Sequence, residues 1–107
     1  MLQVESLGLE AIRDLRPLVE RIKTFDRDLA NQIVRAASSI VLNIAEGSHS
    51  RAGTRRVRFE SAQGSANETR SALLVAIAWG YVSEKDAAAT AKKLDRIVGM
   101  LWGLTRG

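Results

Sequence analysis

The residue types that could perform chemistry are few and widely spaced in this sequence. Glu60 and Glu68 stand eight positions apart, and the single histidine, His49, lies in a loop-like stretch. A metal site inside a helical bundle needs a Glu-x-x-His type of spacing on facing helices, which is missing here, and there is no cysteine. The G-x-S-x-G, P-loop and G-x-G-x-x-G motifs are also missing. We therefore expect no catalytic residues, no metal and no cofactor, and we expect that the protein is not an enzyme.

The densest charged feature is a basic segment that reads HSRAGTRRVRF. Its four arginines are Arg51, Arg55, Arg56 and Arg58. Cations near a helix N-terminus oppose the helix dipole, which suggests a use for them. Guanidinium groups and free helix amides both suit phosphate oxygens. With aromatics at 5%, contact with a nucleic-acid backbone is favoured over base stacking. The alternative is a solvated basic loop, helped by Glu60 four residues from Arg56.

A second unusual stretch is IVRAASSIVLNIAEG at residues 33–47, which is apolar or small almost throughout. It nevertheless contains Arg35, Asn43 and Glu46. Polar groups on an apolar helix face must be paired to be tolerated. We expect Ser65 and Glu68 to join them in a buried polar network that fixes helix register. A functional site is the alternative reading.

Helices must position these residues. The chain has 107 residues, one proline and a composition rich in Ala, Leu and Arg, which favours a single α-helical domain over residues 1–107. Periodicity predicts helices at 6–23, 27–46 and 54–79, and a fourth that follows a Ser83 cap and ends near residue 104. Short connections between them predict an all-α, antiparallel up-down-up-down four-helix bundle.

Local signals mark the ends of these helices. Asp26 and Thr54 are expected N-caps. Gly47 and Gly80 are expected to end the second and third helices. Pro17 predicts a kink in the first helix, or two shorter helices that meet there.

Small residues predict close packing of the second and third helices. If the loop centre lies near residue 50, residues 36–39 face residues 61–65, and both sides are small. We expect Gly64 to allow close approach there.

The second helix carries two apolar stripes, which suggests that it contacts another subunit. One stripe is Ile33, Ala37, Ile40 and Ile44, and the other is Ala30, Val34, Val41 and Ala45. A small bundle covers one stripe well, so we expect a homo-oligomer. Its interface residues are expected to be Val34, Val41, Trp79 and Trp102, since aromatics are enriched at interfaces. No signal peptide or membrane span is evident, so a cytoplasmic location without membrane contact is expected.

Residues 29–82 resemble the family of proteins encoded in intervening sequences of 23S ribosomal RNA genes. That family reads roughly RAA-x-SI-xx-NIAEG, then a basic segment, then F-xx-x-A-x-GS-x-xE and a short LGY-like end. The matching positions are Arg35, Ala36, Ala37, Ser39, Ile40, Asn43, Ile44, Ala45, Glu46, Gly47, Phe59, Ala62, Gly64, Ser65, Glu68, Gly80 and Tyr81. Val41 and Leu42 stand where family members often carry Pro and Ser.

The resemblance implies a four-helix bundle that assembles as a ring, commonly of five subunits. A related branch is the accessory variability determinant of diversity-generating retroelements, a basic ring associated with nucleic acid and a reverse transcriptase. Our leading hypothesis is a non-enzymatic ring that contacts RNA or DNA phosphates through the four arginines. The alternative is a scaffold that recruits another protein, such as a reverse transcriptase, without touching nucleic acid.

Overall fold

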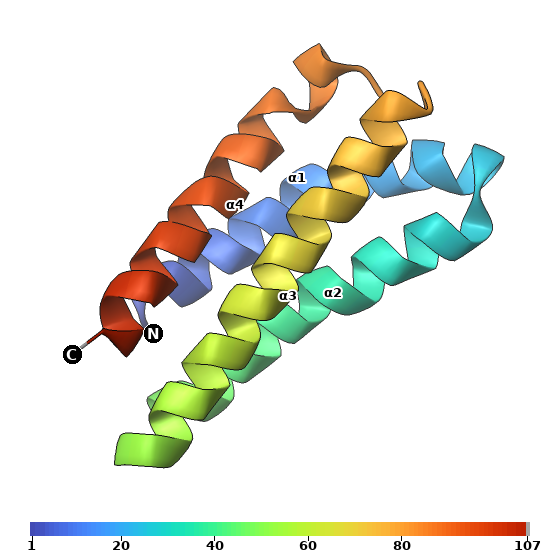
Figure 1. Ribbon diagram of the computed structural model, residues 1–107. Coiled ribbons are helices and arrows are strands. Elements are labelled where there is room, and N and C mark those ends of the chain that lie inside the picture. Colours follow the sequence, from blue (N-terminus) through green and yellow to red (C-terminus); the bar gives the residue numbers. More distant parts are fainter. Residues whose placement is uncertain (107) are drawn as a thin grey trace.

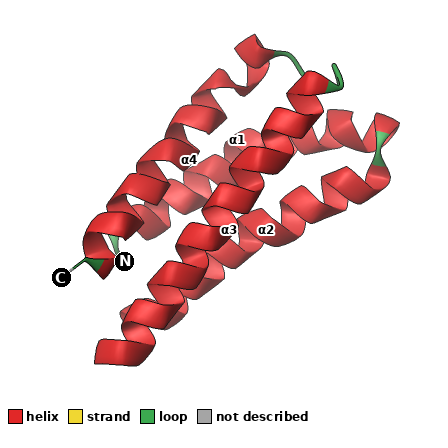
Figure 2. Cartoon of the chain, viewed as in Figure 1, coloured by secondary structure: helices red, strands yellow, loops and turns green. Residues whose placement is uncertain are grey.

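Four α-helices account for nearly all of the described residues, 1–106, in the computed structural model of the chain. They are α1 (Gln3–Phe25), α2 (Arg27–Ser48), α3 (Ala52–Ala78) and α4 (Glu84–Thr105). Consecutive helices run antiparallel, and each packs on two neighbours, with α1 beside α2 and α4 (Figure 1). Figure 2 shows how short the connecting segments are. The predicted all-α, up-down-up-down bundle is confirmed.

Side-chain caps begin two of the helices where the sequence predicts them. The Asp26 carboxylate accepts a hydrogen bond from the Leu29 amide at 3.0 Å at the start of α2. Ser83 accepts from the Asp86 amide at 3.0 Å at the start of α4. After α3 ends, Gly80 adopts a φ of 78°, a left-handed conformation that glycine adopts without steric cost. These three signals are confirmed.

Loss of the Asp26 cap provides a local stability test. The Asp26→Ala variant should unfold with a free energy lower by about 1 kcal/mol, because the Leu29 amide loses its acceptor. Urea denaturation followed by circular dichroism measures the change. Asp28→Ala is the matched control, since Asp28 is exposed in the first turn of α2 and makes no capping bond. Equal losses in both variants would argue against the cap.

Two predicted helix ends are wrong, and close packing at Gly47 explains the first of them. Gly47 is buried inside α2, which continues to Ser48, and α3 already begins at Ala52, so Thr54 is not its N-cap. A Cβ placed on Gly47 would lie 2.5 Å from the Phe59 Cε1 atom, inside van der Waals contact. Gly47 therefore lets the Phe59 ring of α3 rest on the α2 backbone.

The predicted pairing of α2 with α3 is shifted by about four residues, one helical turn. The Ser65 hydroxyl donates to the Ser39 hydroxyl at 2.8 Å, where Ser65 was expected nearer Arg35. Gly64 is exposed, and a Cβ placed on it meets no atom within 4 Å. The prediction that Gly64 mediates close packing is wrong, and Gly47 has that role instead.

All four helices contribute to one hydrophobic core. The exposed fractions of the α2 side chains revise the prediction that one of its two apolar stripes contacts another subunit. The first stripe of α2 is buried, as expected. In the second stripe, Ala30 is also buried, and Val41 is half-buried, near Gly8 of α1. Only Val34, 48% exposed, remains open to solvent. The bundle itself therefore covers most of the stripe that was assigned to a neighbouring subunit.

Helix α1 continues without interruption through Pro17, which excludes two shorter helices at that point. Pro17 is exposed. The carbonyl that its missing N–H leaves unbonded can therefore be hydrated at the surface.

Three aromatic side chains connect the α1–α2 turn with the α3–α4 turn. Phe25 stacks on Tyr81 with ring centroids 5.0 Å apart. Trp79 stacks on the same Tyr81 with centroids 6.4 Å apart. This aromatic stack lies at the opposite end of the bundle from the chain ends marked in Figure 1.

Candidate nucleic-acid interface

The basic segment forms the N-terminal end of α3. Arg51 occupies the N-cap position with extended backbone and makes no side-chain capping bond. Arg55 is half-buried, with its guanidinium carbon 4.7 Å from the centroid of the Phe59 ring. Arg56 forms an ion pair with Glu60 at 3.8 Å, and both side chains are more than half exposed. Exposed pairs of this kind contribute about 0–1 kcal/mol, so Arg56 stays available to a ligand.

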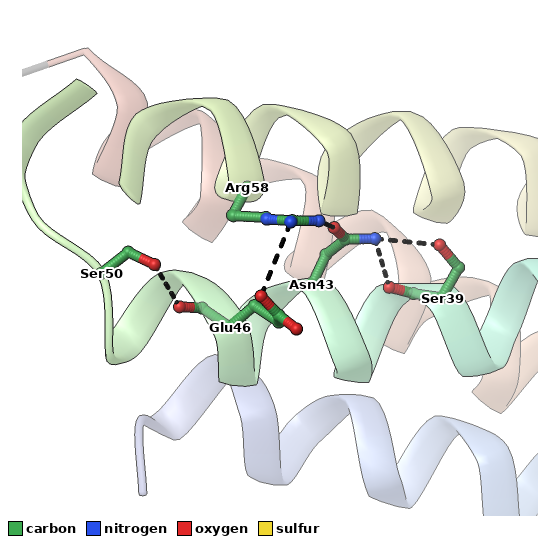
Figure 3. Close-up of polar contacts among 5 residues, drawn as sticks. All are labelled: Ser39, Asn43, Glu46, Ser50 and Arg58. Carbon is green, nitrogen blue, oxygen red and sulfur yellow. Dashed lines mark hydrogen bonds and ion pairs between the residues drawn. The ribbon is translucent and has the colours of Figure 1, made fainter. Parts of the chain in front are cut away.

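Arg58 points away from this group and toward α2. Its guanidinium lies 3.6 Å from a Glu46 carboxylate oxygen and 3.4 Å from the Asn43 amide oxygen (Figure 3). The structure therefore separates Arg58 from the other three arginines. We define Arg51, Arg55 and Arg56 as the arginine cluster. No carboxylate of residues 1–106 forms an ion pair with Arg51 or Arg55.

A chain of polar contacts connects α2 with α3. The Asn43 amide donates to the Ser39 carbonyl at 2.9 Å and to its hydroxyl at 3.0 Å. Ser65 donates to the same hydroxyl, and Arg58 links Asn43 to Glu46 as described above. Figure 3 shows most of this chain, and Ser50 donating to the Glu46 carbonyl. The network is partly exposed, in contrast to the buried network expected.

Two residues expected in this network lie outside it. Arg35 and Glu68 are both exposed, and neither forms an ion pair with any residue of the described chain. The one-turn shift of the α2–α3 pairing explains the difference, because Ser39 takes the place opposite Ser65 that Arg35 was expected to fill. Ser39 and Arg58 belong to the network but were not assigned to it from the sequence, although the predicted pairing placed Arg58 close to Asn43.

The last turn of α4 lies beside the arginine cluster. A small cavity of about 190 Å³ lies between the two helix ends, lined by Ala52, Arg55, Arg56, Leu104 and Thr105. Arg106 follows directly, with its guanidinium carbon 4.0 Å from the centroid of the Trp102 ring. Arg106 is thus a further cation at the same end of the bundle. Sequence reasoning missed it because it stands about fifty positions from the basic segment.

The residues expected at a subunit interface differ in exposure. Val34 is open to solvent and Val41 is half-buried, as described above. Trp79 is 70% exposed in the aromatic stack, and Trp102 is 51% exposed beneath Arg106. These four residues do not form one continuous surface, since Trp79 and Trp102 lie at opposite ends of the bundle.

Two further searches bear on the class of protein. Within residues 1–106, no three His, Cys, Asp or Glu side chains are grouped closely enough to hold a metal ion. None of the helices described in that range is both long and apolar enough to cross a lipid bilayer.

The fold and this surface define a four-helix bundle with a cluster of arginines at one end. Residues 9–103 match the family model of the 23S rRNA-intervening sequence proteins, and the chain belongs to that family. A crystal structure of a protein of unknown function from the S23 ribosomal protein family of Bacteroides thetaiotaomicron is similar, with a TM-score of 0.86. The two chains are 22% identical, and the similarity covers 97% of this chain and 99% of the other. No individually curated protein matches this chain.

Proposed function

We propose that this protein is a non-enzymatic bundle that assembles into a ring and binds RNA or DNA phosphates through the arginine cluster. The observation that carries the proposal is that Arg51 and Arg55 have no carboxylate partner in the described chain, beside an Arg56 that is only weakly paired. Unpaired guanidinium groups at one helix end attract phosphate oxygens and release counterions when they bind them.

Two features support phosphate contact at this end. The first-turn amides of α3 have no side-chain cap, so they remain free to donate to an anion. The ring of Phe59 holds the Arg55 guanidinium in place, which lowers the entropy lost on binding. The family name itself refers to 23S ribosomal RNA.

Assembly into a ring would strengthen nucleic-acid binding by the arginine cluster. One subunit offers three arginines in the cluster, and several copies that engage one nucleic acid gain affinity through effective concentration. The sequence resemblance implies five subunits in that ring. Five copies would present the same cluster around one rim.

The test is fluorescence anisotropy with a labelled structured RNA and a duplex DNA at low salt. Replacing Arg51, Arg55 and Arg56 together by Ala should weaken binding by about tenfold or more, because three phosphate contacts per subunit are lost. Arg58→Ala is the control, since it removes one arginine of the same basic segment, but one whose side chain is directed at Asn43 and Glu46 of α2. Failure of the wild type to bind either probe would contradict the proposal, as would equal binding by the triple variant.

The second candidate function is a scaffold that recruits another protein, such as a reverse transcriptase, without binding nucleic acid. Exposed aliphatic side chains on α2 and α3 favour it, notably Leu42 and Val57, which are 64% and 60% exposed. Exposed apolar surface often marks protein contacts. A partner held by these side chains would bind with little dependence on salt, whereas phosphate contacts weaken steeply.

A further inference from the structure

An apolar groove opens on the surface between α1 and α2. Its volume is about 370 Å³, and its lining includes Ile12, Val19, Val34 and Ala37. Val34, the one residue of the second α2 stripe that α1 leaves exposed, forms part of its wall. The groove therefore offers apolar surface that the bundle itself does not fill.

The groove has a positively charged rim. Arg13 and Arg16 border it, together with one carboxylate, Glu20. Within residues 1–106 none of these three side chains takes part in an ion pair. The surplus of cations favours an apolar occupant that carries a carboxylate.

Helix α3 presents a surface with that chemistry. Glu68, Ser71 and Val75 are exposed at i, i+3 and i+7 spacing, which places them on one face of the helix. We call these three residues the α3 outer stripe. Val75 is 44% exposed, and Glu68 makes no ion pair in the described part of the chain. The stripe lies on a different side of the bundle from the groove.

The groove and the stripe lie at the same level along the bundle. Gly8 of α1 packs against Val41 of α2, and five residues further along α1, Arg13 is level with Ala36 of α2. Ser39 of α2 bonds Ser65 of α3. Three residues along α3 from Ser65, Glu68 is level with the same Ala36, because antiparallel helices rise equally per residue. Since α1 and α3 run in the same direction, Val75 is likewise near the level of Val19.

We propose that the α3 outer stripe of one copy packs into the α1–α2 groove of a second copy, with Glu68 paired to Arg13 and Arg16. The contact is heterologous, because each copy contributes a different surface. Heterologous contacts close into a ring when copies are related by rotation without a shift along the axis, and open into a filament otherwise. Because groove and stripe lie at equal levels, they can meet without a shift along the bundle, as a closed ring requires. The proposal rests on the ring in the proposed function and names the surfaces that form it.

Charge reversal with mass measurement by light scattering after gel filtration tests the contact. Glu68→Arg alone, and Arg13→Glu with Arg16→Glu, should each raise the protein concentration at half-dissociation by about tenfold or more, because like charges then face each other. Combining all three substitutions should recover most of the wild-type assembly. Arg13, Arg16 and Glu68 are all exposed, so circular dichroism should show that the variants keep the helical fold.

Lys92→Glu is the control, since Lys92 is exposed on α4 and belongs to neither surface. It should leave the mass unchanged. A wild type that stays monomeric would overturn the inference, as would reversals that leave the mass unchanged or a combination that fails to restore it. Loss of nucleic-acid binding in the arginine-cluster variant is measured separately, so the contact and the proposed binding function can fail independently.

Discussion

Replacing Gly47 by Ala should destabilise the protein, with a loss of about 1–3 kcal/mol in the free energy of unfolding, as overpacked cores show. The added methyl group would lie 2.5 Å and 2.7 Å from two carbons of the Phe59 ring and 3.2 Å from the Arg58 Cβ atom. Phe59 is buried, and the Arg58 Cβ atom is fixed by the backbone, so neither can move away cheaply. Thermal unfolding followed by circular dichroism should show a Tm about 4–8 °C lower per kcal/mol.

Gly64→Ala is the matched control for this prediction. Gly64 also lies inside a helix, but a Cβ there meets no atom within 4 Å, so Ala should raise stability by about 0.5–1 kcal/mol through helix propensity. Phe59→Leu should relieve part of the cost of Gly47→Ala, because it removes the ring atoms that clash. Additive effects of Gly47→Ala and Phe59→Leu in a double-mutant cycle would contradict the proposed contact.

Salt should weaken nucleic-acid binding strongly. If the three residues of the arginine cluster each contact a phosphate, the slope of log K against log salt is about −2.7 per engaged subunit on duplex DNA. Between 50 and 200 mM salt, one subunit's contacts would then lose about 40-fold in affinity, and more engaged subunits would lose more. Anisotropy titrations at four or five salt concentrations measure the slope.

The triple Ala variant of the cluster should have a slope close to zero if it binds at all. Arg58→Ala should keep the wild-type slope, because the Arg58 side chain is directed at Asn43 and Glu46 of α2 and lies outside the arginine cluster. A flat slope in the wild type would indicate that apolar contacts dominate and would favour the protein-scaffold function.

Local signals predicted the helices well. The Asp26 and Ser83 caps and the Gly80 turn depend on bonds or dihedral angles within a few residues, which a single sequence displays directly. The antiparallel arrangement then follows from the short connections. The position of one helix along its neighbour was harder to predict, because it depends on contacts between residues far apart in the chain.

Gly47 illustrates the limit. A glycine near a loop usually ends a helix, and that interpretation ended α2 two residues before its actual end at Ser48. The actual reason for glycine is a ring twelve positions away, on another helix. The four-residue shift in the α2–α3 pairing, which the loop position does not reveal, misassigned Arg35 and Glu68 to the polar network.

The candidate interface was predicted only in part. The basic segment identified the right end of α3, but it could not show that Arg58 turns back to Glu46. Nor could it show that Arg106 arrives at the same end from α4. Both facts follow from tertiary packing, which brings oppositely directed helix ends together.

The even number of antiparallel helices gives the molecule two unlike ends. Both ends of the chain lie at one of them (Figure 1), alongside the start of α3 with its arginines, and the aromatic stack occupies the other. Any peptide joined to either terminus would emerge next to the guanidinium groups and could shield them. A fluorescent or affinity label is therefore better attached at the end that carries the aromatic stack. The exposed Glu84, replaced by cysteine, provides such a position.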